Sequence, residues 1–175
     1  MKKEEPKRKH PRLKGYDYSQ NGAYFITFCV KDRLYMLGEV VGRDALGAPI
    51  MRLSEYGKTL QNEIEETPLH YDNLTIDNYV IMPNHVHMIV AITGDGAPRA
   101  SRPTALVPRI VAIIKRKTNK IYGFDMWQTS YHDHIIRDEA EYLRTWQYID
   151  ENPADWAEDE YNIRQCDSFV QADPN

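Results

Sequence analysis

Cysteine is scarce in this chain of 175 residues, which has only Cys29 and Cys166, far apart and outside any CxxC pair. A disulfide framework or a zinc ribbon is therefore not expected, and a reduced, cytoplasmic setting fits better. A chain of this length can bury roughly two thirds of its unfolded surface, so its core needs no cross-links.

Long apolar runs are also missing. The cleanest run, residues 86–92, is interrupted by His87 and is far too short to cross a bilayer. The first residues are charged and lack the apolar segment of a signal peptide. We therefore expect one domain with short tails and no membrane partner.

The chain also lacks an overall positive charge, since its net charge is −4. The charge is unevenly distributed, however: residues 97–123 contain seven basic residues and no acidic one, whereas residues 138–175 contain eleven acidic residues and two basic ones. Phosphate contacts depend on local positive charge and tolerate a negative total. The basic stretch is compatible with a nucleic-acid contact and equally with a solvated helix face. If it binds nucleic acid, the residues expected to contact phosphates are Arg109, Lys115, Arg116, Lys117 and Lys120.

Hydrophobic periodicity predicts an α+β fold. Strands are expected at residues 24–30, 74–81, 86–92 and 131–136, and helices at 54–66, 105–121 and 139–151. Ser54, Thr104 and Asp138 are suitable N-caps for the three helices. The first six elements give the order βαββαβ, which is the ferredoxin-like plan of an antiparallel sheet with helices on one face, followed here by a C-terminal helix. Residues 38–52 are expected to form a hairpin or a loop.

The segment from Met82 to Ile92 contains a His-Val-His triplet on an expected strand. Residues two apart on a strand point to the same side, so His85 and His87 should project together. Two neutral imidazoles on one face can chelate a divalent metal. Two surface histidines on an exposed sheet face are the alternative, and the triplet alone does not decide between them. In either case we expect this face to lie outside the core.

The last expected helix contains Tyr148, with Asn152 one turn later. Leu143, Trp146 and Ile149 form the expected apolar stripe, and Tyr148 lies on the opposite side, in line with Asn152. A phenolic oxygen can attack phosphorus and form a covalent intermediate. A surface tyrosine and a C-cap asparagine are the alternative interpretation.

Taken together, these segments resemble the HUH single-tyrosine transposases, and most of all the REP-associated tyrosine transposases. The resemblance covers roughly residues 16–156, in the family order, through the segments Tyr24-Phe-Ile-Thr-Phe, Met82-Pro-Asn-His-Val-His-Met, the helix containing Lys115, Trp127 to Asp138, and Tyr142 to Pro153. It implies a transposase domain at 16–156, between a basic flexible arm at 1–15 and an acidic tail at 157–175. The tail after Asp155 and residues 38–52 depart from the pattern, and neither is expected to touch the site.

The resemblance also implies a mechanism. Tyr148 would be the nucleophile, and His85, His87 and Asn152 would hold a divalent metal, Mg²⁺ or Mn²⁺. The DNA, single-stranded or folded into a hairpin, would be cleaved and rejoined through a 5′-phosphotyrosine. A homodimer is implied, in which the tyrosine helix docks against the histidines of the second copy.

Two other functions remain open from the sequence. A ferredoxin-like sheet can bind single-stranded nucleic acid without any chemistry. A metal-dependent phosphoesterase would use water instead of the tyrosine as nucleophile. Trapping a covalent protein–DNA adduct would distinguish these functions.

Overall fold

A four-stranded antiparallel sheet forms the centre of the protein. The computed structural model describes residues 21–43, 49–93 and 106–162. The strands β1 (Gly22–Cys29), β4 (Leu74–Ile81), β5 (His85–Ile92) and β6 (His132–Ile136) lie in the order β4-β5-β1-β6. All three neighbouring pairs are antiparallel. The ferredoxin-like plan predicted from the element order is therefore confirmed.

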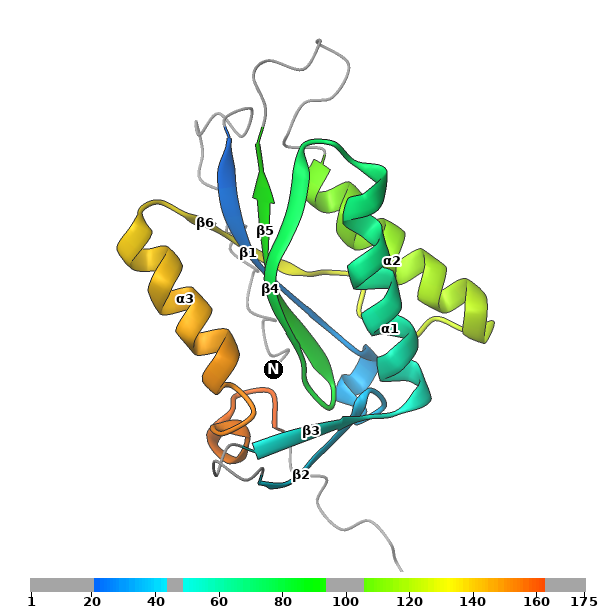
Figure 1. Cartoon of the computed structure of the whole chain (residues 1–175). Helices are drawn as coiled ribbons and strands as arrows, with labels where there is room; N and C mark the ends of the chain where they lie inside the picture. The colour runs from blue at the N-terminus through cyan, green and yellow to red at the C-terminus, as the bar shows by residue number, and fades with distance from the viewer. Residues whose placement is uncertain (1–20, 44–48, 94–105, 163–175) are drawn as a thin grey trace, which may run out of the picture.

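Two helices cover one face of this sheet. These are α1 (Glu55–Glu66) and α2 (Leu106–Tyr122), which lie side by side in Figure 1. The even-numbered side chains of the central strands point towards them and are almost completely buried, among them Ile26, Phe28, Val86 and Met88. This face contains the main apolar core, because strand alternation sends every second side chain to it.

The third helix, α3 (Glu139–Glu151), packs on the opposite face of the sheet (Figure 1). The apolar cluster beneath it is small, with Ile89, Ile136 and Ile149 as its buried members. The expected apolar stripe of this helix is wrong at Leu143, which is 60% exposed. The buried side centres on Ile149, and Leu143 lies about 120° around the helix from it.

Local signals in the sequence explain the element ends. The Ser54 side chain accepts a hydrogen bond from the Gly57 amide, and Asp138 accepts one from the Glu141 amide, so two of the expected N-caps are confirmed. Thr104 lies outside the described residues, as do the basic arm and residues 163–175. The stretch expected as a hairpin or loop forms the hairpin of β2 (Gly38–Arg43) and β3 (Pro49–Leu53). No helix within the described ranges is long and apolar enough to cross a membrane.

Candidate functional site

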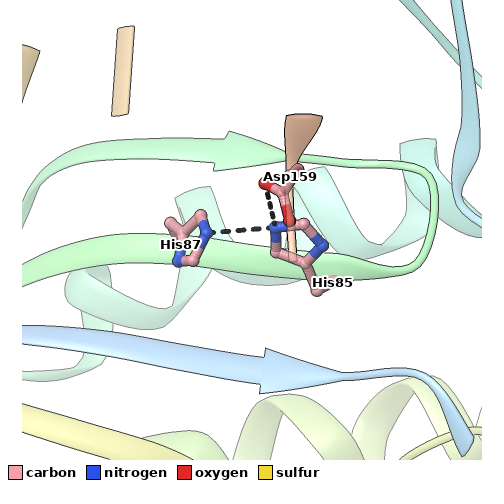
Figure 2. A group of neighbouring side chains, drawn as sticks. All are labelled: His85, His87 and Asp159. Atoms are coloured by element: carbon pink, nitrogen blue, oxygen red, sulfur yellow. Dashed lines mark hydrogen bonds and ion pairs between the residues drawn. The ribbon is translucent and has the colours of Figure 1, made fainter. Parts of the chain in front are cut away.

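The two histidines of β5 meet on the sheet face that carries α3. Their Nε2 atoms lie 3.0 Å apart, with the rings directed towards one another (Figure 2). The expectation that they project together is confirmed. The expectation that their face lies outside the core is wrong, because His85 is 0% exposed and His87 is 2% exposed.

Burial keeps both imidazoles neutral. Loss of water contact is the main cause that lowers the pKa of His85 to about 2 and that of His87 to about 3, and the neighbouring His87 imidazole is the second cause at His85. A neutral imidazole has a free lone pair, which is the form that binds a metal. These histidines are therefore in a ligating state at any ordinary pH.

Hydrogen bonds at the Nδ1 atoms orient the two rings. The Asn84 amide group donates to the backbone carbonyls of Arg33 and Tyr161, which directs its Oδ1 atom to His85 Nδ1 at 2.8 Å. His85 Nδ1 must then carry the proton, so its Nε2 lone pair is free. His87 Nδ1 lies 2.7 Å from the Thr27 hydroxyl, which can accept from it or donate to it. Such partners at the second ring nitrogen are typical of metal-binding histidines.

Helix α3 brings Tyr148 and Asn152 to the same place. The Tyr148 hydroxyl lies 3.4 Å from His87 Nε2, and its ring packs edge-on against that imidazole. Burial and, secondly, the Asp159 charge raise the pKa of Tyr148, while a hydrogen bond from Asn152 lowers it. Asn152 is 2% exposed, and its Oδ1 atom has no hydrogen-bond partner among the described residues. A buried amide oxygen without a partner is costly, so its position suits a ligand that would complete the site.

A residue that the sequence did not single out completes the cluster. The Asp159 Oδ2 atom lies 3.9 Å from His85 Nε2, and its side chain is only 5% exposed. His85, His87 and Asp159 each offer one potential ligand atom, and these three atoms all lie within 4.8 Å of one another (Figure 2). The expectation that the acidic tail does not touch the site is therefore wrong. Only its local spacing after Asn152 could have indicated Asp159, because acidic residues are common throughout this end of the chain.

Asp159 belongs to a segment that covers the histidines, residues 155–162, which we call the strap. The Tyr161 ring lies 4.5 Å from the His85 ring, and the Trp156 ring lies 6.0 Å from it. Arg33 holds the strap from the other side, because its Nη1 atom donates to the Glu160 carbonyl at 2.9 Å and its guanidinium stacks 4.8 Å from the Tyr161 ring centre. The strap thus covers His85, whereas His87 is covered mainly by the rings of Phe25 and Tyr148.

The donor set fits a small divalent cation. Two adjacent ligands of an octahedral Mg²⁺ at about 2.1 Å lie about 3 Å apart, which matches the separation of the two Nε2 atoms. The unpartnered Asn152 oxygen and the Asp159 carboxylate supply the oxygen ligands that Mg²⁺ and Mn²⁺ prefer. Roles of these residues as ligands stay a prediction.

The five cations expected to contact DNA differ in their surroundings. Arg109, Arg116 and Lys120 are exposed on α2. Lys115 is half-buried, and its ammonium donates to the Gln128 carbonyl at 2.7 Å and the Ser130 carbonyl at 3.1 Å. Burial lowers its pKa to about 8.

Lys117 is also engaged. Its ammonium lies 2.7 Å from the Glu63 carboxylate of α1. Residues 97–123 contain no acidic residue, but the fold brings Glu63 of α1 next to Lys117. A DNA contact by any of the five residues stays a prediction.

Comparisons with known proteins find relatives in sequence and in fold. A Haemophilus influenzae protein of uncharacterized function is 33% identical over 176 residues, covering 89% of this chain and 93% of its own length. Another protein of the same organism, named as a candidate REP-associated tyrosine transposase, is 22% identical over 144 residues, covering 78% of this chain and 73% of its own length. The chain is therefore similar in sequence to a REP-associated tyrosine transposase. No protein-family profile matches it.

The fold of this family is also the fold of the chain. A solved REP-associated tyrosine transposase, bound to a REP hairpin, superposes with a TM-score of 0.61 at 19% identity, covering 85% of this chain and 74% of its own. Within the chain, α3 packs on its own sheet and places Tyr148 beside its own His87. One copy can therefore assemble the whole cluster, and the expected homodimer stays a prediction.

Proposed function

We propose that the protein cleaves and rejoins single-stranded or hairpin DNA, with Tyr148 as nucleophile and a divalent metal held by His85 and His87. The observation that carries this proposal is the meeting of the phenol, two neutral imidazoles and an unpartnered amide oxygen in one buried cluster. A binding module needs no such cluster. The solved relative bound to a REP hairpin supports DNA as the substrate.

The metal would be Mg²⁺ or Mn²⁺, with His85, His87 and the oxygens of Asn152 and Asp159 as its protein ligands. When bound, such an ion polarises the scissile phosphate and stabilises the charge that develops on it. The chain contributes rigid placement, because Asn84 and Thr27 hold the two imidazoles through their Nδ1 atoms. Fixed ligands need little reorganisation during the reaction.

Tyr148 would attack the phosphorus atom. A bond forms between the phenolic oxygen and phosphorus while the bond to the 3′-oxygen breaks, which leaves a 5′-phosphotyrosine and a free 3′-hydroxyl. The phenol loses one proton and the leaving 3′-oxygen gains one, so the step neither consumes nor releases protons overall. Attack by a second 3′-hydroxyl reverses the step and joins two strands without a nucleotide cofactor.

The phenol must approach its ionised form to attack well. Burial and the Asp159 carboxylate both oppose ionisation, since they raise the pKa of Tyr148. Asn152 favours it through its hydrogen bond. Asn152 therefore has two tasks in the proposal, to offer its oxygen to the metal and its amide group to the phenol.

Access for DNA requires movement of the strap. His85 and His87 are fully buried, and Tyr161 and Trp156 lie against the His85 ring. A phosphate can contact the imidazoles only after these side chains shift. The strap is held mainly by polar and aromatic contacts at its rim, such as the bond from Tyr35 to Asn162 at 2.5 Å.

The test is the trapping of a covalent adduct. The full chain is incubated with a single-stranded hairpin DNA and Mn²⁺, and the products are separated on a denaturing gel. The wild-type protein should give a protein–DNA adduct, which mass spectrometry of the nuclease-trimmed complex should locate on Tyr148. Tyr148→Phe should give none while it retains DNA binding, because only the attacking hydroxyl is removed.

Tyr142→Phe is the matched control on the same helix. The Tyr142 hydroxyl donates to Asp77 at 2.9 Å, away from the histidines, so its loss should leave the adduct intact. Cleavage without an adduct would show that water is the nucleophile. Robust cleavage by Tyr148→Phe, or an adduct on another tyrosine, would overturn the mechanism.

A further inference from the structure

A basic groove runs along the outside of α2 and around its C-terminal end. One hollow of about 600 Å³ is lined by Arg116, Lys120 and Phe124, and a second of about 330 Å³ is lined by Lys31 and Gln128. The two hollows share Lys115, Asn119 and Asp125, so they form one continuous surface depression. Each is within the size range of sites that bind small molecules or single nucleotides.

The charge and aromatic content of the groove suit a nucleic-acid strand. Four cations, Lys31, Lys115, Arg116 and Lys120, face one carboxylate, Asp125. Asp125 already accepts a hydrogen bond from the Asn119 amide at 3.1 Å. Phe124 is 42% exposed and stands against the rings of Tyr56 and Tyr122, which hold it in place. An exposed ring among cations is the usual platform on which a nucleobase stacks.

The turn η1 (Lys31–Arg33) connects this groove to the histidine cluster. Lys31 lines the second hollow, and two residues later Arg33 packs over Tyr161 of the strap. Asp32 and Arg33 both have left-handed backbone conformations, with φ of 55° and 53°. Two consecutive residues of this kind, neither of them glycine, cost free energy and are enriched at functional sites.

The other wall of the groove reaches the same end of the sheet. The backbone amide of Gln128 donates to the Cys29 carbonyl at 2.9 Å, and Cys29 is paired with His85 in the sheet. The groove therefore ends at β1, one β-strand away from the histidines of β5. A DNA strand that lies in the groove would reach the edge of the strap.

We propose that this groove binds the single-stranded DNA next to a hairpin and leads it past Lys31 and Arg33 to Tyr148. Phe124 stacks on a base, and Lys31 and Arg116 contact phosphates. The inference deepens the proposed cleavage and rests on it, but the groove can be tested by binding alone. It explains why cations on the α2 side of the sheet would serve a site on the α3 side.

The experiment measures binding of the full chain by fluorescence anisotropy in EDTA, where no metal-dependent cleavage occurs. Two DNAs are compared, a hairpin alone and the same hairpin with a single-stranded extension. The wild type should bind the extended DNA more tightly. Phe124→Ala should lose affinity for the extended DNA by about fivefold or more, the effect of one lost stacking contact, and keep its affinity for the hairpin alone.

Lys31→Ala should lower the salt dependence of binding to the extended DNA by about 0.7 in the slope of log K against log salt. Arg52→Ala is the matched control, because it removes an exposed cation that lines neither hollow of the groove and is paired with Glu39 on the β2–β3 hairpin. Its binding should equal that of the wild type. Equal losses on both DNAs, no loss in either groove variant, or no preference of the wild type for the extended DNA would overturn the groove. A failed adduct test would instead overturn the cleavage, so the two failures are distinguishable.

Discussion

The two faces of β5 are equally buried and yet serve different purposes. Val86, Met88 and Val90 face α1 and α2, where each is completely buried among apolar side chains. His85 and His87 face the other way, where their neighbours are Thr27, Tyr148 and the strap. Burial alone therefore does not distinguish core from site in this protein. The partners of a buried side chain do, because an imidazole that is buried among polar groups can act as a ligand.

The separation has a simple cause. Alternate residues of a strand point to opposite faces, so one strand can support the core with one set and the chemistry with the other. A substitution on one face should therefore change stability, and a substitution on the other face should change metal binding and cleavage. The following predictions test this division, starting with the largest effect.

His87→Ala should abolish adduct formation and weaken Mn²⁺ binding by more than about 100-fold, because it removes a ligand itself and not only its support. The protein should still fold, although the Thr27 hydroxyl loses its partner at a cost of about 1–3 kcal/mol. Titration calorimetry with Mn²⁺ and thermal unfolding would measure the two effects. His70→Ala, at an exposed histidine, is the control and should match the wild type in both.

Met88→Ala should have the opposite profile. Met88 is 0% exposed in the apolar core, so its truncation should cost about 2–5 kcal/mol of unfolding free energy. Mn²⁺ affinity of the folded protein should be unchanged. Urea unfolding gives the first quantity and calorimetry the second. Loss of metal affinity without loss of stability would contradict the division between the two faces.

Asp159→Asn should lower Mn²⁺ affinity in the absence of DNA by about tenfold, because a neutral amide replaces a carboxylate beside the two imidazoles. The pKa of Tyr148 should also fall, since the Asp159 charge contributes to raising it. Glu160→Gln is the control for metal affinity, since Glu160 is not in the cluster and its contact with Arg33 is made by its backbone carbonyl. Equal Mn²⁺ affinities of the two variants would exclude Asp159 as a ligand.

The smallest effect is expected on the outside of α2. Arg116→Ala should weaken DNA binding a few-fold. It should also lower the slope of log K against log salt by the amount that corresponds to about one phosphate contact. Lys117→Ala should change binding less, because its ammonium is already paired with Glu63. Anisotropy titrations at several salt concentrations would compare the neighbouring residues. A larger effect at Lys117 would show that the ion pair opens when DNA binds.

Much of the fold was predictable because its signals are local. The spacing of apolar residues and the caps at Ser54 and Asp138 located α1 and α3, and the element order then indicated the ferredoxin-like sheet. The apolar stripe of α3 was placed incorrectly at Leu143. Helical spacing predicts that a helix has a buried side, but the centre of that side depends on how the helix sits on the sheet.

Part of the site was predictable for the same reason. Strand alternation brings His85 and His87 together, and one helical turn brings Tyr148 and Asn152 together, so each pair is determined by short-range geometry. Their meeting with one another was implied only by the resemblance to a family.

The order of the elements, the two short-range pairs and the resemblance to the REP-associated tyrosine transposases could all be read from the sequence. Three facts could not be read from it: the histidines are buried, Asp159 joins them, and Glu63 pairs with Lys117. These three facts depend on contacts between segments that are distant along the chain. Burial, ion pairing and ligand geometry are properties of such contacts, and no local pattern encodes them.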